Sequence, residues 1–233
     1  MVLIQSILFC LIISSTKQPQ NVIMNNTDYA DCSKNSSWLA LGDSYTIGES
    51  VNEDERFPVQ TVALLKKDNL IINPLQYIAT TGWTTQNLLD AIAAQNLKAP
   101  FDIVSLLIGV NDQYQHMDTA GYQKRFEECL QKAIALAGNK TNHVFVLSIP
   151  DYSVTPFASG SDTAQIRKEI DVFNAINKAI TLSYNISYIN ITPLTREAKN
   201  NASFITNDGL HPSGKEYAKW AALLAAEIKK VLR

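Results

Sequence analysis

The chain has 233 residues, of which 46% are hydrophobic and 18% charged, and its formal net charge is −2 at pH 7. This length suits one α/β domain with a sizeable apolar core. Acidic and basic residues are mixed along the chain and form no basic stripe, so no nucleic-acid partner is expected.

The N-terminal residues have the pattern of a targeting segment. Residues 2–13 are apolar except for one glutamine and a serine, which is too short a run to span a bilayer comfortably. Small polar residues follow, so residues 1–16 are predicted to be a secretory signal peptide, cleaved near residues 15–20. No Lys or Arg precedes the run, and an uncleaved membrane anchor is the alternative. We expect a polar leader at 17–36, a single folded domain at 37–233, and a secreted or periplasmic protein.

Strand and helix patterns alternate through the rest of the chain. In chain order they are a strand at 38–44, a helix at 56–69, a strand at 71–82, a helix at 84–97, a strand at 101–112, a helix at 119–138, a strand at 143–151, a helix at 161–184, a strand at 186–192 and a helix at 212–232. The boundary signals are Pro74 for an edge or irregular strand, Thr84 or Thr85 and Ser161 or Asp162 as helix N-caps, Gly138 as a helix end and Pro212 near the last helix start.

Five β-then-α units predict an α/β fold with a mostly parallel five-stranded sheet and helices on both faces, a three-layer α/β/α sandwich. In such sheets ligand sites gather beyond the carboxyl ends of the strands. The residues just past those predicted ends are Ser44, Gly82, Asn111 and Pro150.

The first of these positions, Ser44, follows the apolar run in "LALGDSYTIGES". Glycine, aspartate and serine are common turn residues, so Ser44 taken alone is either a turn residue or a nucleophile held at the end of a strand. Position 46 is Thr, so the segment is not the G-x-S-x-G elbow of the α/β-hydrolases.

Three histidines are present, and only His211 has an acidic residue at a suggestive spacing. Asp208 precedes it by three residues in "NDGLHPSG", so the carboxylate can orient one ring nitrogen while the other faces outward. An exposed histidine at a helix start explains the same segment equally well. His116 and His143 are expected to be structural or solvent-facing.

Donors for a developing oxyanion are available on two further loops. Gly82 in "ATTGWTT" offers a backbone N–H and Asn111 in "IGVND" an amide group. Simple turn chemistry also accounts for each of them.

Four segments in order, "GDSYTIGE", "TTGWTT", "IGVND" and "DGLHPSG", resemble the four blocks of the SGNH or GDSL hydrolases, over about residues 38–230. The resemblance implies a flavodoxin-like α/β/α fold and gives each motif residue a role: Ser44 is the nucleophile, Asp208 and His211 are the acid and base, and the oxyanion hole is formed by Ser44, Gly82 and Asn111. The resemblance implies a structural rather than a catalytic role for Asp43. The segment 148–158 resembles a loop of secreted bacterial members, and Tyr152 and Phe157 on it are expected as pocket walls.

The expected function is therefore a serine esterase that acts on carboxylic esters, with short acyl or acetyl groups favoured because no long apolar insertion is present. It needs no metal or organic cofactor, and its partner is a small-molecule, glycan or lipid ester. A lysophospholipase or thioesterase for longer acyl chains is the runner-up. A non-catalytic carbohydrate-binding module on the same scaffold is a rival, and a nucleotide binder is disfavoured because the first loop is not G-x-G-x-x-G.

The cysteines suggest neither a disulfide framework nor a metal site. Cys32 and Cys129 lie far apart in the sequence, and Cys129 falls in a helical pattern, where it is expected to be a buried apolar residue. Asn35, Asn139 and Asn201 occupy Asn-x-Ser/Thr sequons, which matter only in a host that glycosylates.

Overall fold

The structure is a computed structural model that describes residues 35–233; the predicted signal peptide, most of the predicted leader and Cys32 lie outside the described residues. Its strands are β1 Ser36–Gly42, β2 Ile72–Ala79, β3 Ile103–Leu107, β4 Val144–Leu147 and β5 Ser187–Ile189. They form one parallel sheet in the order β2-β1-β3-β4-β5. The predicted fold class is thereby confirmed.

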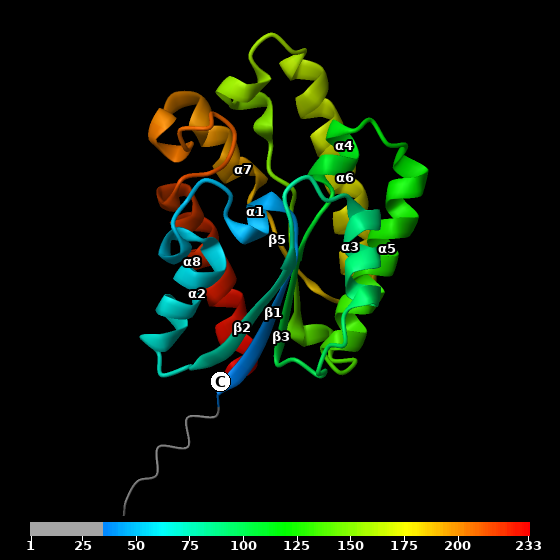
Figure 1. Cartoon of the computed structure of the whole chain (residues 1–233), viewed down its shortest axis with the longest axis vertical. Coiled ribbons are helices and arrows are strands. Elements are labelled where there is room, and N and C mark those ends of the chain that lie inside the picture. Colours follow the sequence, from blue (N-terminus) through cyan, green and yellow to red (C-terminus); the bar gives the residue numbers. More distant parts are fainter. Residues whose placement is uncertain (1–34) are drawn as a thin grey trace, which may run out of the picture. The chain divides into compact units, whose positions relative to one another are not determined.

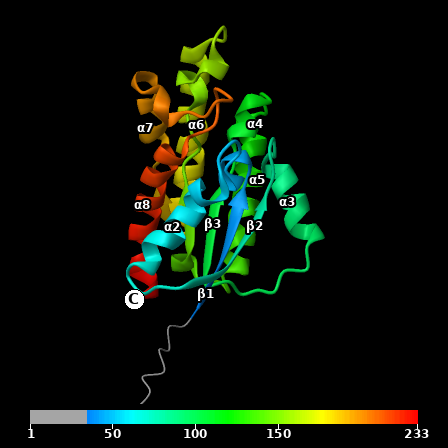
Figure 2. The same cartoon turned by 60° about the vertical axis from the view of Figure 1, so that its left-hand side comes forward.

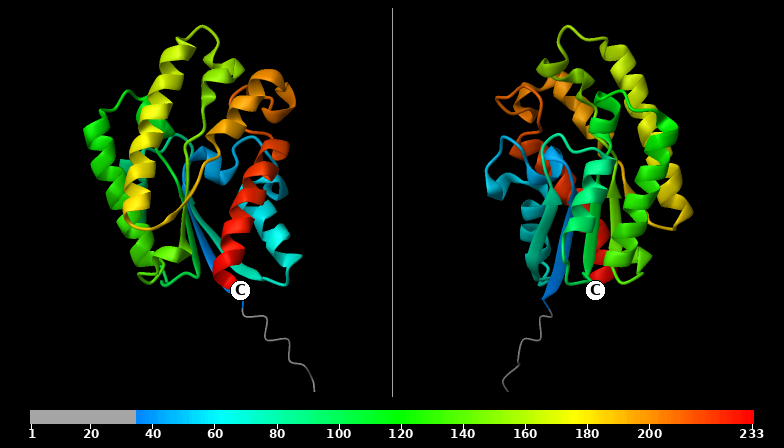
Figure 3. Two further views of the ribbon diagram at one scale, coloured as in Figure 1. Left: turned by 180° about the vertical axis from the view of Figure 1, so that it is seen from behind. Right: turned by 45° about the vertical axis from the view of Figure 1, so that its right-hand side comes forward.

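Helices cover both faces of this sheet (Figures 1 and 3). The α-helices are α1 Ser44–Ile47, α2 Phe57–Lys66, α3 Thr85–Ala94, α4 Val110–Tyr114, α5 Thr119–Leu136, α6 Thr163–Ser183, α7 Thr192–Thr195 and α8 Gly214–Leu232. The 3-10 helices are η1 Glu53–Glu55, η2 Thr141–His143, η3 Tyr152–Val154, η4 Pro156–Ala158, η5 Arg196–Asn200 and η6 Ala202–Phe204. Helices α2 and α8 pack together on one face, and α3, α5 and α6 pack in a row on the other. No helix among the described residues is long and apolar enough to cross a membrane.

The core lies between these layers and explains the continuous apolar runs in the sequence. Residues Trp38 to Leu41 of β1 are fully buried, because β1 lies inside the sheet and is covered on both faces. The buried indole of Trp38 donates through Nε1 to Ser105 Oγ on β3, at 3.0 Å, which satisfies both polar groups within the sheet. Each large apolar side chain buried in this way contributes about 1.5–3 kcal/mol.

The boundary signals in the sequence act largely as predicted. Pro74 lies in β2, which is an edge strand and has a register irregularity against β1. Thr84 caps α3 and Asp162 caps α6, and Gly138 follows the end of α5 at a φ of 67°. Cys129 is fully buried.

Several expected elements are shorter than the apolar pattern suggests. The run at 101–112 is not one strand: β3 ends at Leu107, and Val110 opens α4, a helix that the sequence did not indicate. Apolar residues continue past the strand because Ile108 and Val110 are buried beneath the loops that surround the carboxyl end of the sheet. Figure 2 shows α4 and α7 at that end, toward which the strands point.

Candidate active site

The turn that follows β1 places Ser44 at the carboxyl end of the sheet. Asp43 caps α1 by accepting a hydrogen bond from the Tyr45 N–H at Oδ1, 3.0 Å away. A side chain at position 42 would come within 2.0 Å of Thr46 Oγ1 and 2.5 Å of the Leu107 carbonyl oxygen, so the strand can turn here only at a glycine. Ser44 is the first residue of α1, directly after the Asp43 cap, and it is 4% exposed.

His211 lines the same pocket as Ser44 and forms a hydrogen-bonded pair with Asp208. His211 Nδ1 lies 2.7 Å from Asp208 Oδ2. Backbone N–H groups of Leu210 and His211 donate to Asp208 Oδ1 at 2.8 and 3.0 Å, which fixes the carboxylate relative to the imidazole. The ring of His211 packs against the ring of Tyr45, with centroids 5.1 Å apart. A histidine with one ring nitrogen bound in this way presents its other nitrogen, Nε2, as a proton acceptor.

Side-chain donors hold the Asp208 carboxyl in its charged form. Ser50 Oγ donates to Oδ2 at 2.6 Å and Thr206 Oγ1 to Oδ1 at 2.7 Å. Burial alone would raise the pKa of Asp208, but these hydrogen bonds and those from His211 outweigh it and hold the pKa well below its usual range. The carboxylate is consequently negative at any pH at which an imidazolium forms beside it.

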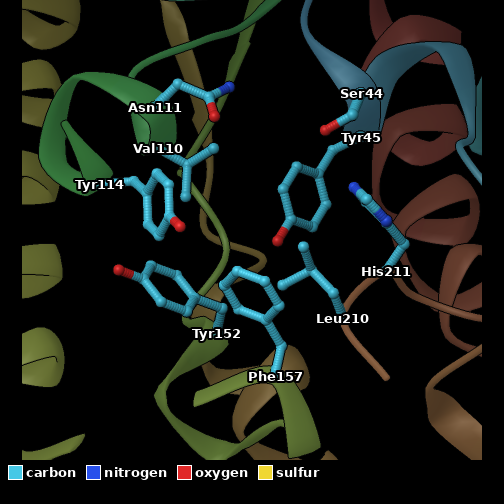
Figure 4. Close-up of a pocket in the computed structure, with 9 residues that line it drawn as sticks. All are labelled: Ser44, Tyr45, Val110, Asn111, Tyr114, Tyr152, Phe157, Leu210 and His211. Carbon is cyan, nitrogen blue, oxygen red and sulfur yellow. The ribbon is translucent and has the colours of Figure 1, made fainter. Parts of the chain in front are cut away.

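A small pocket of about 80 Å³ joins the serine to the histidine. Its lining residues are Ser44, Tyr45, Val110, Asn111, Tyr114, Tyr152, Phe157, Leu210 and His211. In Figure 4, Ser44 and His211 lie on one side, the rings of Tyr114 and Tyr152 lie across from them, and Phe157 lies at the bottom between Tyr152 and Leu210. Tyr152 and Phe157 thus line the pocket, as the sequence led us to expect.

Asn111 lies in this pocket, whereas Gly82 is not among the residues that line it. Asn111 Nδ2 donates a hydrogen bond to the Trp83 carbonyl at 3.0 Å. The second hydrogen on Nδ2 forms no hydrogen bond with the described residues. Gly82 has a φ of 80° and lies next to Trp83 on the β2–α3 loop. The loop that carries Gly82 is thus tied to the pocket through Asn111.

The other two histidines lie outside this pocket. His143 precedes β4, at the other end of the sheet, and its Nδ1 lies 2.7 Å from the Asp102 carbonyl oxygen. His116 is exposed and has a φ of 56°. Among residues 35–233, no group of three or more His, Cys, Asp or Glu side chains could hold a metal ion.

Two buried carboxyl groups lie next to the site residues: Asp43, for which the sequence analysis expected a structural role, and Asp112, which it did not single out. Asp43 is fully buried, and burial, reinforced by the nearby negative charge of Asp112, raises its pKa to about 8. Asp112 accepts hydrogen bonds from the Thr85 N–H at 2.8 Å and from Thr85 Oγ1 at 2.6 Å, and Arg125 lies 3.4 Å away. The sequence signals for these residues were their positions in the segments "GDSYTIGE" and "IGVND", directly after strand-like runs.

Ser50, Tyr45 and Tyr114 were also missed. Ser50 reaches the site because Gly48 ends α1 in a left-handed turn, with a φ of 69°. Nothing in the spacing of these residues distinguishes them from ordinary loop and helix residues.

Comparison with known proteins agrees with this geometry. A family model described as "GDSL-like Lipase/Acylhydrolase family" matches residues 40–219. No curated protein is similar enough in sequence to match the chain.

Solved structures share the fold at low sequence identity. The crystal structure of TesA has a TM-score of 0.65 and 17% identity, and the match covers 84% of this chain and 100% of that one. Axe2, an acetylxylan esterase from Geobacillus stearothermophilus, has a TM-score of 0.59 and 19% identity, with 83% and 94% covered. The lipase/acylhydrolase from Enterococcus faecalis has a TM-score of 0.62 and 20% identity, with 85% and 97% covered.

Proposed function

Since the chain belongs to the GDSL-like lipase/acylhydrolase family, and so is a carboxylic ester hydrolase, we propose that it cleaves short acyl or acetyl esters through an acyl-enzyme on Ser44. The observation that carries the proposal is the pocket itself. It joins Ser44 to His211, whose Nδ1 is bound to Asp208 at 2.7 Å. A nucleophile, a base and an orienting carboxylate in this relation can perform acyl transfer.

The reaction proceeds in two halves. His211 Nε2 takes the proton from Ser44 Oγ as the oxygen attacks the ester carbonyl carbon, and the tetrahedral intermediate collapses to release the alcohol with that proton. Water then enters, gives a proton to His211 and attacks the acyl-serine, which releases the acid and restores Ser44. Asp208 stays ionised throughout and stabilises the imidazolium in both halves.

We assign the oxyanion hole to the Ser44 and Gly82 N–H groups and the Asn111 amide. The uncommitted hydrogen on Asn111 Nδ2 supports this role, because the other one already holds the amide in place against Trp83. Loss of one such donor typically costs about 10²–10³-fold in kcat.

The size of the pocket supports a short acyl group. Its volume of about 80 Å³ is well below the roughly 300–1,000 Å³ of pockets that enclose drug-sized ligands. Two further features fit the proposal: the fold of the acetylxylan esterase Axe2, and an N-terminal segment typical of export, which supports a secreted or periplasmic site of action.

Hydrolysis of p-nitrophenyl esters from acetate to decanoate tests this function. We expect wild type to prefer acetate or butyrate. Ser44→Ala should lose at least about 10³-fold in kcat with an unchanged circular dichroism spectrum. The control variant Ser183→Ala, which changes an exposed serine at the C-terminal end of α6, should match wild type. Preference for decanoate would instead support the lysophospholipase or thioesterase alternative. Equal activity of wild type and Ser44→Ala would refute the proposed nucleophile, and inactivity of the wild type on every ester would favour the carbohydrate-binding module.

A further inference from the structure

A second hollow adjoins the catalytic pocket and has more than four times its volume, about 380 Å³. The two share Tyr114, Tyr152 and Phe157 as lining residues, so they meet at these three rings. The remaining lining of the second hollow comes from the start of α6 and from His116. A group attached to the reacting carbonyl can therefore extend from the first space into the second.

The three shared rings form a platform for a flat or ring-shaped group. Their centroids lie 5.9–6.2 Å apart, within the range of packed aromatic pairs. Tyr114 is 51% and Phe157 46% exposed, which makes them two of the few large apolar side chains of the described chain that face solvent. Exposed aromatic rings beside a pocket favour stacking against a ligand.

The opposite lining consists of polar and negatively charged side chains and one apolar side chain, that of Ile166. Glu169 accepts hydrogen bonds from Gln165 Nε2 and Gln113 Nε2, both at 2.7 Å, and these bonds lower its pKa, so it is ionised. Asp162, which caps α6, adds a second carboxyl group, and Ser161 and His116 add further polar groups. An alkyl chain would strip water from these groups and give no hydrogen bond in return, and an anionic head group would be repelled.

We propose that this second hollow binds the alcohol moiety of the ester, and that this moiety is a hydroxyl-rich ring of monosaccharide size that carries no negative charge. The proposal rests on the esterase function above. Ring hydroxyls donate to Glu169 and Asp162 and accept from Gln165, while the apolar face of the ring lies on Tyr114 and Phe157. When the acyl–oxygen bond breaks, the acyl group remains on Ser44, and the sugar oxygen takes the proton from His211 and leaves through this hollow.

Two esters with the same acetyl group and a primary alkyl oxygen test the assignment: methyl 6-O-acetyl-glucopyranoside and ethyl acetate. We expect wild type to have a kcat/KM at least about tenfold higher for the glucoside. Gln165→Ala, which changes a residue of the second hollow that does not line the catalytic pocket, is expected to lower that value about three- to tenfold and to change the value for ethyl acetate by less than about twofold. Tyr114→Ala is expected to lower the value for the glucoside by a similar factor. Gln131→Ala, which removes a glutamine from the distant surface of α5, is the matched control and should resemble wild type on both esters.

Equal kcat/KM for the two esters in wild type, or equal losses on both in Gln165→Ala, would overturn the assignment. So would a Gln165→Ala effect confined to p-nitrophenyl decanoate, because the hollow would then hold an acyl chain. If wild type releases acetate from neither ester, the esterase function itself fails. Saturation-transfer NMR with methyl glucopyranoside then tests whether the hollow binds a sugar. A transfer signal that is weaker in Gln165→Ala and Tyr114→Ala than in wild type would support sugar binding there. The absence of a signal in wild type would refute it.

Discussion

Ser50 and Asp208 lie 158 positions apart in the sequence, yet Ser50 Oγ donates a 2.6 Å hydrogen bond to Asp208 Oδ2. The same oxygen binds His211 Nδ1 at 2.7 Å. Ser50 has a φ of 65°, in the left-handed region that costs a side-chain-bearing residue about 1–2 kcal/mol. A strained residue whose hydroxyl reaches the acid beside the proposed base is a positioning residue of the site.

Replacing Ser50 separates this hydrogen bond from the backbone strain. Ser50→Ala and Ser50→Gly both remove the bond to Asp208, and we expect each to lower kcat about five- to tenfold on p-nitrophenyl acetate. Glycine also relieves the strain, so Ser50→Gly should be more stable than Ser50→Ala by about 1 kcal/mol in urea unfolding. Unchanged kcat in both variants would contradict a positioning role.

Ser50→Ala should also change how stability depends on pH. The folded-state pKa of Asp208 is held below that of the unfolded chain, so its contribution to stability is present above about pH 4 and is lost as pH falls through the folded-state pKa. The variant has a smaller depression of this pKa. Its deficit in free energy of unfolding should therefore be constant from about pH 5 to 7 and shrink below about pH 4. A deficit that grows on acidification would show that Asp208 is not the group involved.

The sequence predicted the parts of this protein that depend on local patterns. Apolar runs bounded by turn residues identify the strands, because buried strands and amphipathic helices have distinct periods. The alternation of strands and helices along the chain predicted a mostly parallel sheet. The four motif segments also identified Ser44, Asn111 and His211, which the structure brings to one pocket.

Contacts between distant segments could not be predicted in this way. Ser50 reaches Asp208, and Glu169 on α6 faces Tyr114 across the second hollow, only because the loops fold over the same end of the sheet. The period of apolar residues along one segment carries no information about contacts between distant segments. Short helices such as α4 were not predicted for a related reason, because five residues are too few to establish a helical period.

Asn111 provides a direct test of the proposed oxyanion hole. We expect Asn111→Ala to lower kcat on p-nitrophenyl acetate about 10²–10³-fold with a small change in KM, because the donor acts mainly in the transition state. Gln115→Ala is the matched control, since Gln115 Nε2 also reaches the same loop, at the Gly82 carbonyl 3.5 Å away, but does not line the pocket. Equal losses in both variants would assign Asn111 to loop positioning alone.

Gly82 can be tested against a glycine with the same backbone constraint. Gly82 and Gly160 have φ values of 80° and 89°, and a side chain added at either would meet nothing within 4 Å. Alanine at each should therefore cost a similar free energy of unfolding, about 1–2 kcal/mol. We expect only Gly82→Ala to lower kcat, by about tenfold or more, because only its N–H is proposed to face the oxyanion. Equal kcat in the two variants would remove Gly82 from the proposed oxyanion hole.

Asp43 should make the protein less stable as pH rises toward neutrality. Burial, opposed in part by the Tyr45 N–H and reinforced by Asp112, raises its pKa to about 8, whereas the usual value for an exposed carboxyl of this kind is 3.8. Between these values the folded state keeps a proton that the unfolded chain releases, so the free energy of unfolding falls with rising pH.

The variant Asp43→Asn tests this dependence, because asparagine has nearly the shape of the aspartate side chain but does not titrate. Its stability relative to wild type should rise from about pH 5 to about pH 8, by up to about 1.4 kcal/mol per pH unit, in urea unfolding. Asp90→Asn, an exposed control on α3, should show no such trend, and a parallel pH dependence of Asp43→Asn and wild type would show that Asp43 is ionised in the folded protein.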